Sequence, residues 1–183
     1  DRSNNILENL EYFEKVIKQF SEKISLSLKA GNKLLFCGNG GSAAESQHMA
    51  AEYCATLNHN NPRKGFKAIA LSVDTSFITA WSNDFGFEGI FERQVETLGE
   101  ENDVLICYST SGSSKNIIKA VIEAKRKNMH VLAFTGNSSS NELSKLSDHS
   151  FIAPSTQTAL IQEMHTIIGH EVCLAVEKLI ARE

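Results

Sequence analysis

The sequence predicts an α/β fold, a three-layer αβα sandwich built on a five-stranded parallel sheet. Short apolar runs of five or six residues alternate with longer stretches of helical periodicity, which is the pattern of a parallel sheet covered on both faces. The common order for five such strands with right-handed crossovers is 2-1-3-4-5, the flavodoxin-like order. A chain of 183 residues suits one domain with a sizeable core.

The beginning of the sequence predicts an amphipathic helix that ends near Gly31. Its apolar positions are three or four residues apart, as one face of a helix requires: Ile6, Leu10, Phe13, Ile17, Phe20 and Ile24. Since this helix precedes the first strand, its apolar face must cover either the domain itself or a second subunit. We therefore expect one domain over residues 1–183, with an oligomerisation helix at 1–31 and the α/β core at 32–183.

The remaining elements are predicted from run length and periodicity. We expect strands at residues 33–37, 67–72, 103–108, 130–135 and 149–153. We expect helices at residues 43–57, 75–82, 87–99, 114–128, 141–147 and 157–181. In the 2-1-3-4-5 order the chain reverses direction between strands one and three. The loops after these two strands therefore meet at the carboxyl edge of the sheet, where ligands bind.

The composition argues against several classes of protein. The net charge is −4, and the basic run at 125–127 is typical of a solvated helix face, so we expect no nucleic-acid partner. No apolar run approaches the ~20 residues of a membrane helix, and the polar start of the sequence is unlike a signal peptide. The four cysteines have no CxxC spacing, and Cys37 and Cys107 lie in strand-like runs, which favours buried thiols and a cytoplasmic location.

Two loops rich in small polar residues come after strands one and three. The first is Asn39-Gly40-Gly41-Ser42, and the second, residues 109–114, consists of serine, threonine and glycine. Backbone N–H groups, hydroxyls and the positive end of a helix dipole suit such loops to an anion, and to phosphate best. Helix caps and turns would explain one such loop equally well. Neither loop matches a Walker A sequence or the dinucleotide-binding fingerprint.

Histidine, carboxylate and amide side chains recur at helical spacing on two predicted helices. His48 and Glu52 are four residues apart and share a helix face. Gln162 and His170 are eight apart, about 80° around the helix axis, and can face one site. Together these four residues offer nitrogen and oxygen donors suited to zinc, although a lone histidine on a helix is more often an ordinary surface or core residue. His165, one turn from Gln162, is ambiguous.

A series of short motifs resembles one known family in order and spacing. The motifs are Gly38-Asn39-Gly40-Gly41-Ser42, Gln47-His48, Ala51-Glu52, Asp74-Thr75-Ser76, Asn83-Asp84-Phe85-Gly86-Phe87, Ser109-Thr110-Ser111-Gly112 and Ile161-Gln162-Glu163-Met164-His165. Each motif alone is of modest specificity, but the set spans essentially the whole chain and is specific. The chain resembles the phosphoheptose isomerases (sedoheptulose 7-phosphate isomerases) of the sugar-isomerase (SIS) domain superfamily.

The resemblance implies an activity and an assembly. The implied reaction converts sedoheptulose 7-phosphate to D-glycero-D-manno-heptose 7-phosphate by enediol proton transfer. This is the first step in the synthesis of ADP- or GDP-heptose, the precursor of the heptose in lipopolysaccharide or related surface glycans. The implied assembly is a homotetramer with active sites between subunits, and neither a membrane nor a nucleic acid is an implied partner.

The resemblance also implies roles for individual residues. Substrate contacts are implied at Asn39, Gly40, Gly41, Ser42, Glu52, Asn83, Asp84, Ser109, Thr110, Ser111, Ser114 and Gln162, with the phosphate against the loop at 109–114. One zinc ion per subunit is implied on His48, Glu52, Gln162 and His170. Aldose–ketose isomerisation needs a base and an acid, for which Glu52 and His170 are the candidates. A carboxylate that binds metal is a weaker base, so a catalytic and a structural zinc both stay open.

Two non-catalytic hypotheses compete with the enzyme. Adaptors that associate with the bacterial replication initiator share the fold, and a sugar-phosphate-sensing regulator would keep the loops, but neither would need Glu52 and His170. The presence of both residues favours the enzyme. The chain departs from the usual pattern of the family at Ala55-Thr56, Ser82 and Leu160, which bears on substrate preference and interface contacts. Asp84 taken alone suits a turn as well as a site.

Overall fold

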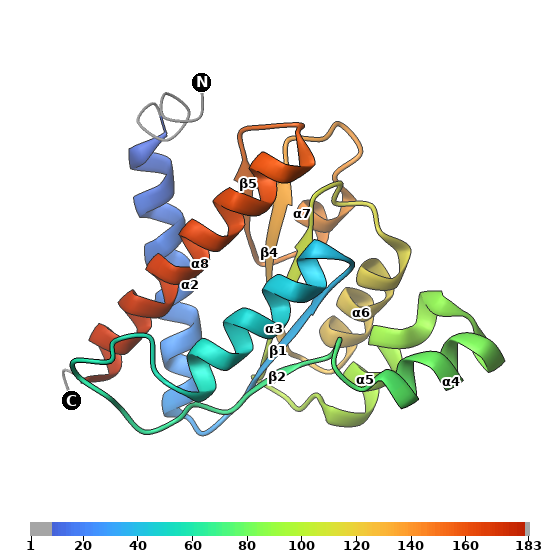
Figure 1. Cartoon of the computed structure of the whole chain (residues 1–183), viewed down its shortest axis with the longest axis horizontal. Coiled ribbons are helices and arrows are strands. Elements are labelled where there is room, and N and C mark those ends of the chain that lie inside the picture. The colour runs from blue at the N-terminus through green and yellow to red at the C-terminus, as the bar shows by residue number, and fades with distance from the viewer. Residues whose placement is uncertain (1–8, 182–183) are drawn as a thin grey trace.

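The chain folds around a five-stranded parallel sheet with the order β2-β1-β3-β4-β5, as Figure 1 shows. This computed structural model describes residues 9–181. The strands are β1 (Leu34–Gly38), β2 (Ala68–Ala70), β3 (Val104–Ser109), β4 (His130–Gly136) and β5 (His149–Ala153). The strand order and the parallel pairing confirm the predicted fold class. β2 is shorter than predicted, since it lies at the sheet edge and pairs with β1 alone.

Helices connect the strands close to the predicted positions. They are α2 (Leu10–Lys29), α3 (Gly41–Cys54), α4 (Thr75–Phe85), the short 3-10 turn η1 (Phe87–Gly89), α5 (Ile90–Leu98), α6 (Lys115–Arg126), α7 (Glu142–Leu146) and α8 (Thr158–Ala181). α3 begins two residues earlier than predicted and ends at Cys54 instead of residue 57. α4 runs three residues beyond its predicted end and stops where Gly86 adopts a φ of 94°. Asn83 and Asp84 therefore lie on the last turn of a helix and not in a loop.

The two faces of the sheet carry separate cores because side chains alternate along each strand. On one face, residues such as Leu34 and Phe36 of β1 pack against α2, α3 and α8. On the other face, Leu35 and Cys37 belong to a core that α5, α6 and α7 cover, with α4 at the margin of this layer. These four β1 side chains are at most 1% exposed. The helices α3 and α8 thus share one layer, while α4 belongs to the opposite layer.

The N-terminal helix packs on its own domain. Phe13, Phe20 and Ile24 of α2 are at most 5% exposed, and α2 lies against α8 (Figure 1). The ring of Phe20 meets the ring of Phe134 on β4 edge-on, with centroids 5.2 Å apart. Most of the predicted apolar face of α2 is therefore covered within the chain, but Leu10 is 49% exposed, and Ile6 lies outside the described residues. An oligomerisation role for this helix stays a prediction.

The carboxyl ends of β1 and β3 lie side by side at the point where the strand order reverses, as predicted. Side-chain amides connect the segments beyond these two strand ends, because Asn39 and Asn116 exchange two hydrogen bonds of 2.9 and 2.8 Å. The predicted buried thiols are confirmed, since Cys37 and Cys107 are fully buried with their Sγ atoms 3.6 Å apart. None of the helices between residues 9 and 181 has the length and apolarity to cross a membrane.

Candidate active site

The turn from β1 into α3 requires glycine at two positions. Gly40 has a φ of 57° and a ψ of −119°, a conformation that residues with a Cβ rarely adopt. At Gly41, a Cβ would lie 2.6 Å from Nε2 and 2.7 Å from Oε1 of Gln162. The absence of this Cβ lets the amide of Gln162, on α8, rest directly against the first turn of α3. Gly40 thus permits the turn, and the lack of a side chain at Gly41 lets α8 approach the N-terminus of α3.

The turn from β3 into α6 presents a concentration of hydroxyl groups. The Oγ atoms of Ser109 and Ser114 lie 3.2 Å apart, and Gly112, with a φ of 66°, donates its N–H to Ser109 Oγ at 3.2 Å. Thr110 and Ser111 open onto a polar hollow of about 510 Å³. The remaining lining residues come from the segments after β4 and β5: Asn137, Ser138, Ser139, Ser155, Thr156, Thr158 and Ile161. None of the residues lining this hollow is acidic or basic, so it offers hydroxyl and amide donors to an anion.

Three of the four predicted metal-ligating residues meet between α3 and α8. The Nε2 atoms of His48 and His170 are 2.7 Å apart, and Nδ1 of His48 lies 3.9 Å from Oε1 of Glu52. One ligand atom from each residue lies within 4.8 Å of the other two. The two ring nitrogens are within hydrogen-bond distance, and which of them donates depends on the tautomers of the two rings. The structure therefore brings two imidazoles and a carboxylate together from residues up to 122 positions apart.

Gln162 and His48 line one hollow of about 470 Å³ between the first half of α8 and α3. Gly41 and Ser42 lie at the α3 N-terminus in the same hollow. The hollow therefore connects the Gly-rich turn with the histidine cluster. His170 is not among the residues that line this hollow, so the prediction that Gln162 and His170 face one site stays a prediction.

Sequence reasoning missed one carboxylate in this hollow. Glu45, one turn before His48 on α3, accepts a hydrogen bond of 2.7 Å from Thr166 through Oε2. Its Oε1 atom is buried and has no hydrogen-bond partner among the residues that the structure describes. Buried acceptors without partners are uncommon, and one that lines a hollow is a candidate contact for a ligand. Glu45 could have been found from the sequence, because it lies three residues before His48 and so shares a helix face with it.

Asn83 and Asp84 are not brought to this cluster within the chain. They lie at the exposed end of α4, in the layer opposite α3 and α8, and Nδ2 of Asn83 donates to Asp84 Oδ1 at 2.8 Å. Their predicted contact with substrate stays a prediction. Asn116, which the sequence did not single out, is 3% exposed and holds Asn39 beside the start of α6.

Two further titratable groups near the site are structural. His165 is 1% exposed and donates from Nε2 to the carbonyl of Thr135 at 3.2 Å, and burial lowers its pKa to about 4. Burial likewise raises the pKa of Cys173, on α8, to about 12, so that thiol stays protonated beside the cluster. Neither group is therefore a candidate acid–base residue, which resolves the ambiguity over His165.

The parallel sheet with two Gly/Ser-rich turns at its carboxyl edge is shared with a known domain family. The family model for the SIS domain matches residues 1–136, and the chain belongs to this family. It is 45% identical over 173 residues to the phosphoheptose isomerase of Campylobacter jejuni, covering 94% of this chain and 91% of that protein. It is 44% identical over 175 residues to the phosphoheptose isomerase of Helicobacter pylori, covering 96% and 90%.

Solved structures agree with these relatives. The phosphoheptose isomerase GmhA from Neisseria gonorrhoeae superimposes with a TM-score of 0.88 at 36% identity, over 97% of this chain and 93% of that chain. A phosphoheptose isomerase from Francisella tularensis gives 0.89 at 35% identity, over 96% and 92%. The NanR protein of Vibrio vulnificus, complexed with ManNAc-6P, matches with a TM-score of 0.59 at 20% identity, over 99% and 61%, which shows a shared fold alone. The resemblance predicted from the motifs is confirmed.

Proposed function

We propose that this protein is a phosphoheptose isomerase, which converts sedoheptulose 7-phosphate to D-glycero-D-manno-heptose 7-phosphate. One observation carries the proposal, namely the cluster of His48, Glu52 and His170 beside the hollow that leads to the Gly-rich turn. The relatives that share 44–45% of their residues over nearly the whole chain bear that name. The chain is accordingly an enzyme of the aldose–ketose isomerase class.

Glu52 and His170 supply the base and the acid of this reaction. Glu52 takes a proton from C1 of the open-chain ketose while His170 gives a proton to the carbonyl oxygen at C2, which leaves an enediol. Glu52 then returns its proton to C2 and His170 recovers the proton of the C1 hydroxyl, so that C1 becomes the aldehyde. The contact of His48 with His170 supports this assignment, because it orients the ring that must exchange protons with both oxygens.

The phosphate end of the substrate lies against the loop at 109–114 in this proposal. The free backbone N–H groups at the α6 N-terminus and the hydroxyls of Ser109, Thr110, Ser111 and Ser114 are suited to a phosphate without a basic side chain. Asn39, Gly40, Gly41, Ser42 and Gln162 would contact the sugar between the loop and the cluster.

A zinc ion, one per subunit, is part of the proposal. The donor set of His48, Glu52 and His170 fits zinc, since two imidazoles and a carboxylate converge there, and the amide oxygen of Gln162 is the fourth donor that we propose. A bound zinc would supply a Lewis acid for the substrate oxygens or a structural tie between α3 and α8. Because a carboxylate that binds metal is a weaker base, zinc on Glu52 would lower the basicity that the proton transfer needs.

We further propose a homotetramer with active sites between subunits, located in the cytoplasm. Phe85 and Phe87, which flank the end of α4, are 72% and 53% exposed, and a neighbouring subunit would cover them. Asn83 and Asp84 lie beside this apolar surface, where a subunit contact would bring new groups to them. The product would enter the synthesis of ADP- or GDP-heptose for lipopolysaccharide or related glycans.

Isomerisation of sedoheptulose 7-phosphate in D2O, followed by NMR with and without added zinc, tests the function. We expect turnover with solvent deuterium appearing at C2, and a loss of at least about a hundredfold in kcat for Glu52→Gln and for His170→Gln. Lys178→Met, at an exposed position on α8, is the matched control and should keep wild-type kcat. A wild-type protein that binds the phosphosugar without turning it over would support the adaptor or regulator hypothesis instead.

A further inference from the structure

The loop between α3 and β2 contains one arginine, which donates hydrogen bonds to the last backbone carbonyls of α3. Arg63 donates from Nη1 to the carbonyls of Tyr53 and Ala55 at 2.8 and 3.2 Å, and from Nη2 to the carbonyl of Glu52 at 3.0 Å. Its guanidinium lies 3.8 Å from the centroid of the Phe66 ring. The last carbonyls of a helix have no partners within the helix, and a cation there also opposes the helix dipole. Arg63 is therefore a C-terminal cap of α3.

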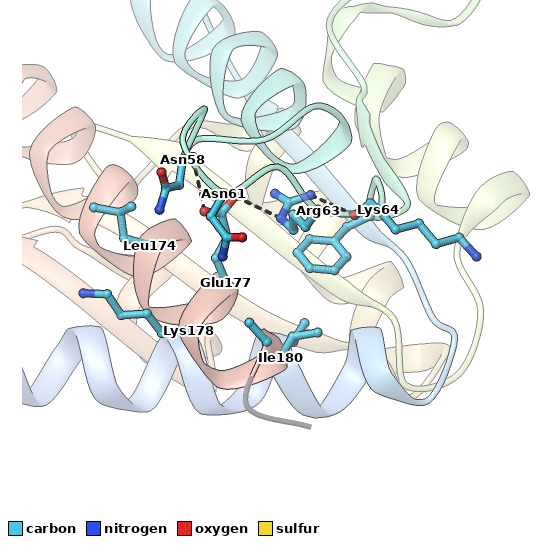
Figure 2. A pocket seen from close by; sticks show the side chains of 10 residues that line it. Asn58, Asn61, Arg63, Lys64, Leu174, Glu177, Lys178 and Ile180 are labelled. Carbon is cyan, nitrogen blue, oxygen red and sulfur yellow. Dashed lines mark hydrogen bonds and ion pairs between the residues drawn. The ribbon is translucent and has the colours of Figure 1, made fainter.

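Glu177, on α8, holds the other side of the same arginine. Its Oε1 lies 2.9 Å from Nε of Arg63 in an ion pair whose N–H is not aligned as a hydrogen bond. It also accepts the backbone N–H of Leu57 at 3.0 Å and that of Asn58 at 3.3 Å. Figure 2 shows Arg63 and Glu177 pointing toward each other in the pocket between the loop and α8. Both side chains are at most 15% exposed, so the pair is largely screened from water.

The two helices that this pair connects carry the two halves of the proposed active site. Glu52 lies in the last turn of α3, which ends at Cys54, and last turns fray unless their carbonyls are satisfied. His170 lies on α8 two turns before Glu177. The proton transfer needs Glu52 and His170 at a fixed separation. Arg63 and Glu177 hold the C-terminal end of α3, where the helix is free to fray and the separation could change.

We propose that Arg63 and Glu177 are positioning residues that hold the catalytic base Glu52 in register with His170. This inference rests on the proposed isomerase function and adds residues that touch neither substrate nor zinc. Arg63 fixes the backbone of the α3 terminus, including the carbonyl of Glu52 itself, and Glu177 anchors Arg63 to α8. Lysine at position 63 would keep the charge but lack the planar fork that spans three carbonyls and the carboxylate.

The test compares Arg63→Lys and Glu177→Gln with wild type at a temperature where circular dichroism shows each variant folded. We expect kcat to fall about tenfold to a hundredfold with KM changed less than about threefold, because a base displaced by about 1 Å transfers protons poorly while the phosphate site is intact. Backbone amides at the end of α3 should exchange with D2O faster, and those of α6 should not. The double variant should be no worse than the more damaging single variant.

Arg126→Lys is the matched control. Arg126 forms a two-point ion pair with Glu123 on α6, on the opposite face of the sheet, and its replacement should leave kcat unchanged. A kcat within twofold of wild type for both Arg63→Lys and Glu177→Gln would overturn the proposal and leave the pair with a purely structural role. If wild type itself shows no turnover, the proposed function fails, and the amide exchange at the end of α3 alone then supports or overturns the positioning role.

Discussion

Substitution of Gly41 by alanine should separate folding from function. The new Cβ would lie 2.6 Å from Nε2 of Gln162, so the amide must retreat by about 0.8 Å to reach 3.4 Å, where ordinary contact begins. The amide of Gln162 is the flexible end of a long side chain and can move at a cost of about 1 kcal/mol. Alanine in place of glycine in the first turn of α3 gains up to about 1 kcal/mol of helix propensity. We therefore expect the free energy of unfolding to change by less than about 1 kcal/mol.

The activity of Gly41→Ala should fall much more than its stability. If Gln162 contacts the substrate or zinc, displacing its amide loses one hydrogen bond or ligand bond, worth about 1.5 kcal/mol, and lowers kcat/KM about tenfold. Urea unfolding and the kinetics of sedoheptulose 7-phosphate isomerisation measure the two effects. In the Gln162→Ala background the clash is absent, so adding Gly41→Ala should lower kcat/KM less than twofold further. Wild-type activity of Gly41→Ala, or a full tenfold effect in the Gln162→Ala background, would refute the reasoning.

Two further predictions concern His165, which the sequence left open, and Glu45, which the sequence did not single out. Burial lowers the pKa of His165 to about 4 in the folded chain, whereas its pKa in the unfolded chain is 6.5. Between these two pH values, the unfolded chain binds the proton and the folded chain does not. Stability should be constant above pH 6.5 and fall by up to about 3 kcal/mol towards pH 4, and His165→Gln should flatten that part of the urea-unfolding profile. Glu45→Gln keeps an oxygen that accepts the hydrogen bond from Thr166 but removes the charge from the side chain whose Oε1 has no partner. We expect the KM for sedoheptulose 7-phosphate to rise about tenfold, and the midpoint of urea unfolding to be unchanged or higher. An unchanged KM would mean that Glu45 contacts Thr166 but not the substrate.

Local patterns were sufficient for the fold. Apolar runs of strand length and helical periodicity predicted each strand and helix of residues 9–181 to within a few residues, and the right-handed crossover rule left few strand orders to consider. The errors in the prediction lie at the ends of helices and strands, where several neighbouring residues could each end the element. α4 passes residue 82 because Gly86, and not the Ser82–Asn83 step, supplies the positive φ that ends it. β2 stops early because an edge strand has one partner to extend along.

The candidate site was predictable where its residues are close in sequence. His48 and Glu52 share a face of α3 at i and i+4, and the loops after β1 and β3 meet at the reversal of strand order. The pairing of His48 with His170 was compatible with the spacing but not implied by it, because it depends on how α3 and α8 rotate about their axes when they pack on one face of the sheet. Asn83 and Asp84 show the opposite outcome, since α4 packs on the other face.

The sequence by itself determined the parallel sheet, the Gly/Ser-rich turns after β1 and β3, and the types of side chain at these places, since each of these depends on local conformation and on side-chain chemistry. Only the tertiary structure decided that Gln162 rests on Gly41, that Glu45 keeps an unpaired oxygen, and that His165 is a neutral core residue. It also decided that Arg63 caps α3 and pairs with Glu177. These contacts join residues on different elements or depend on burial, and both are set by packing, which no short stretch of sequence encodes.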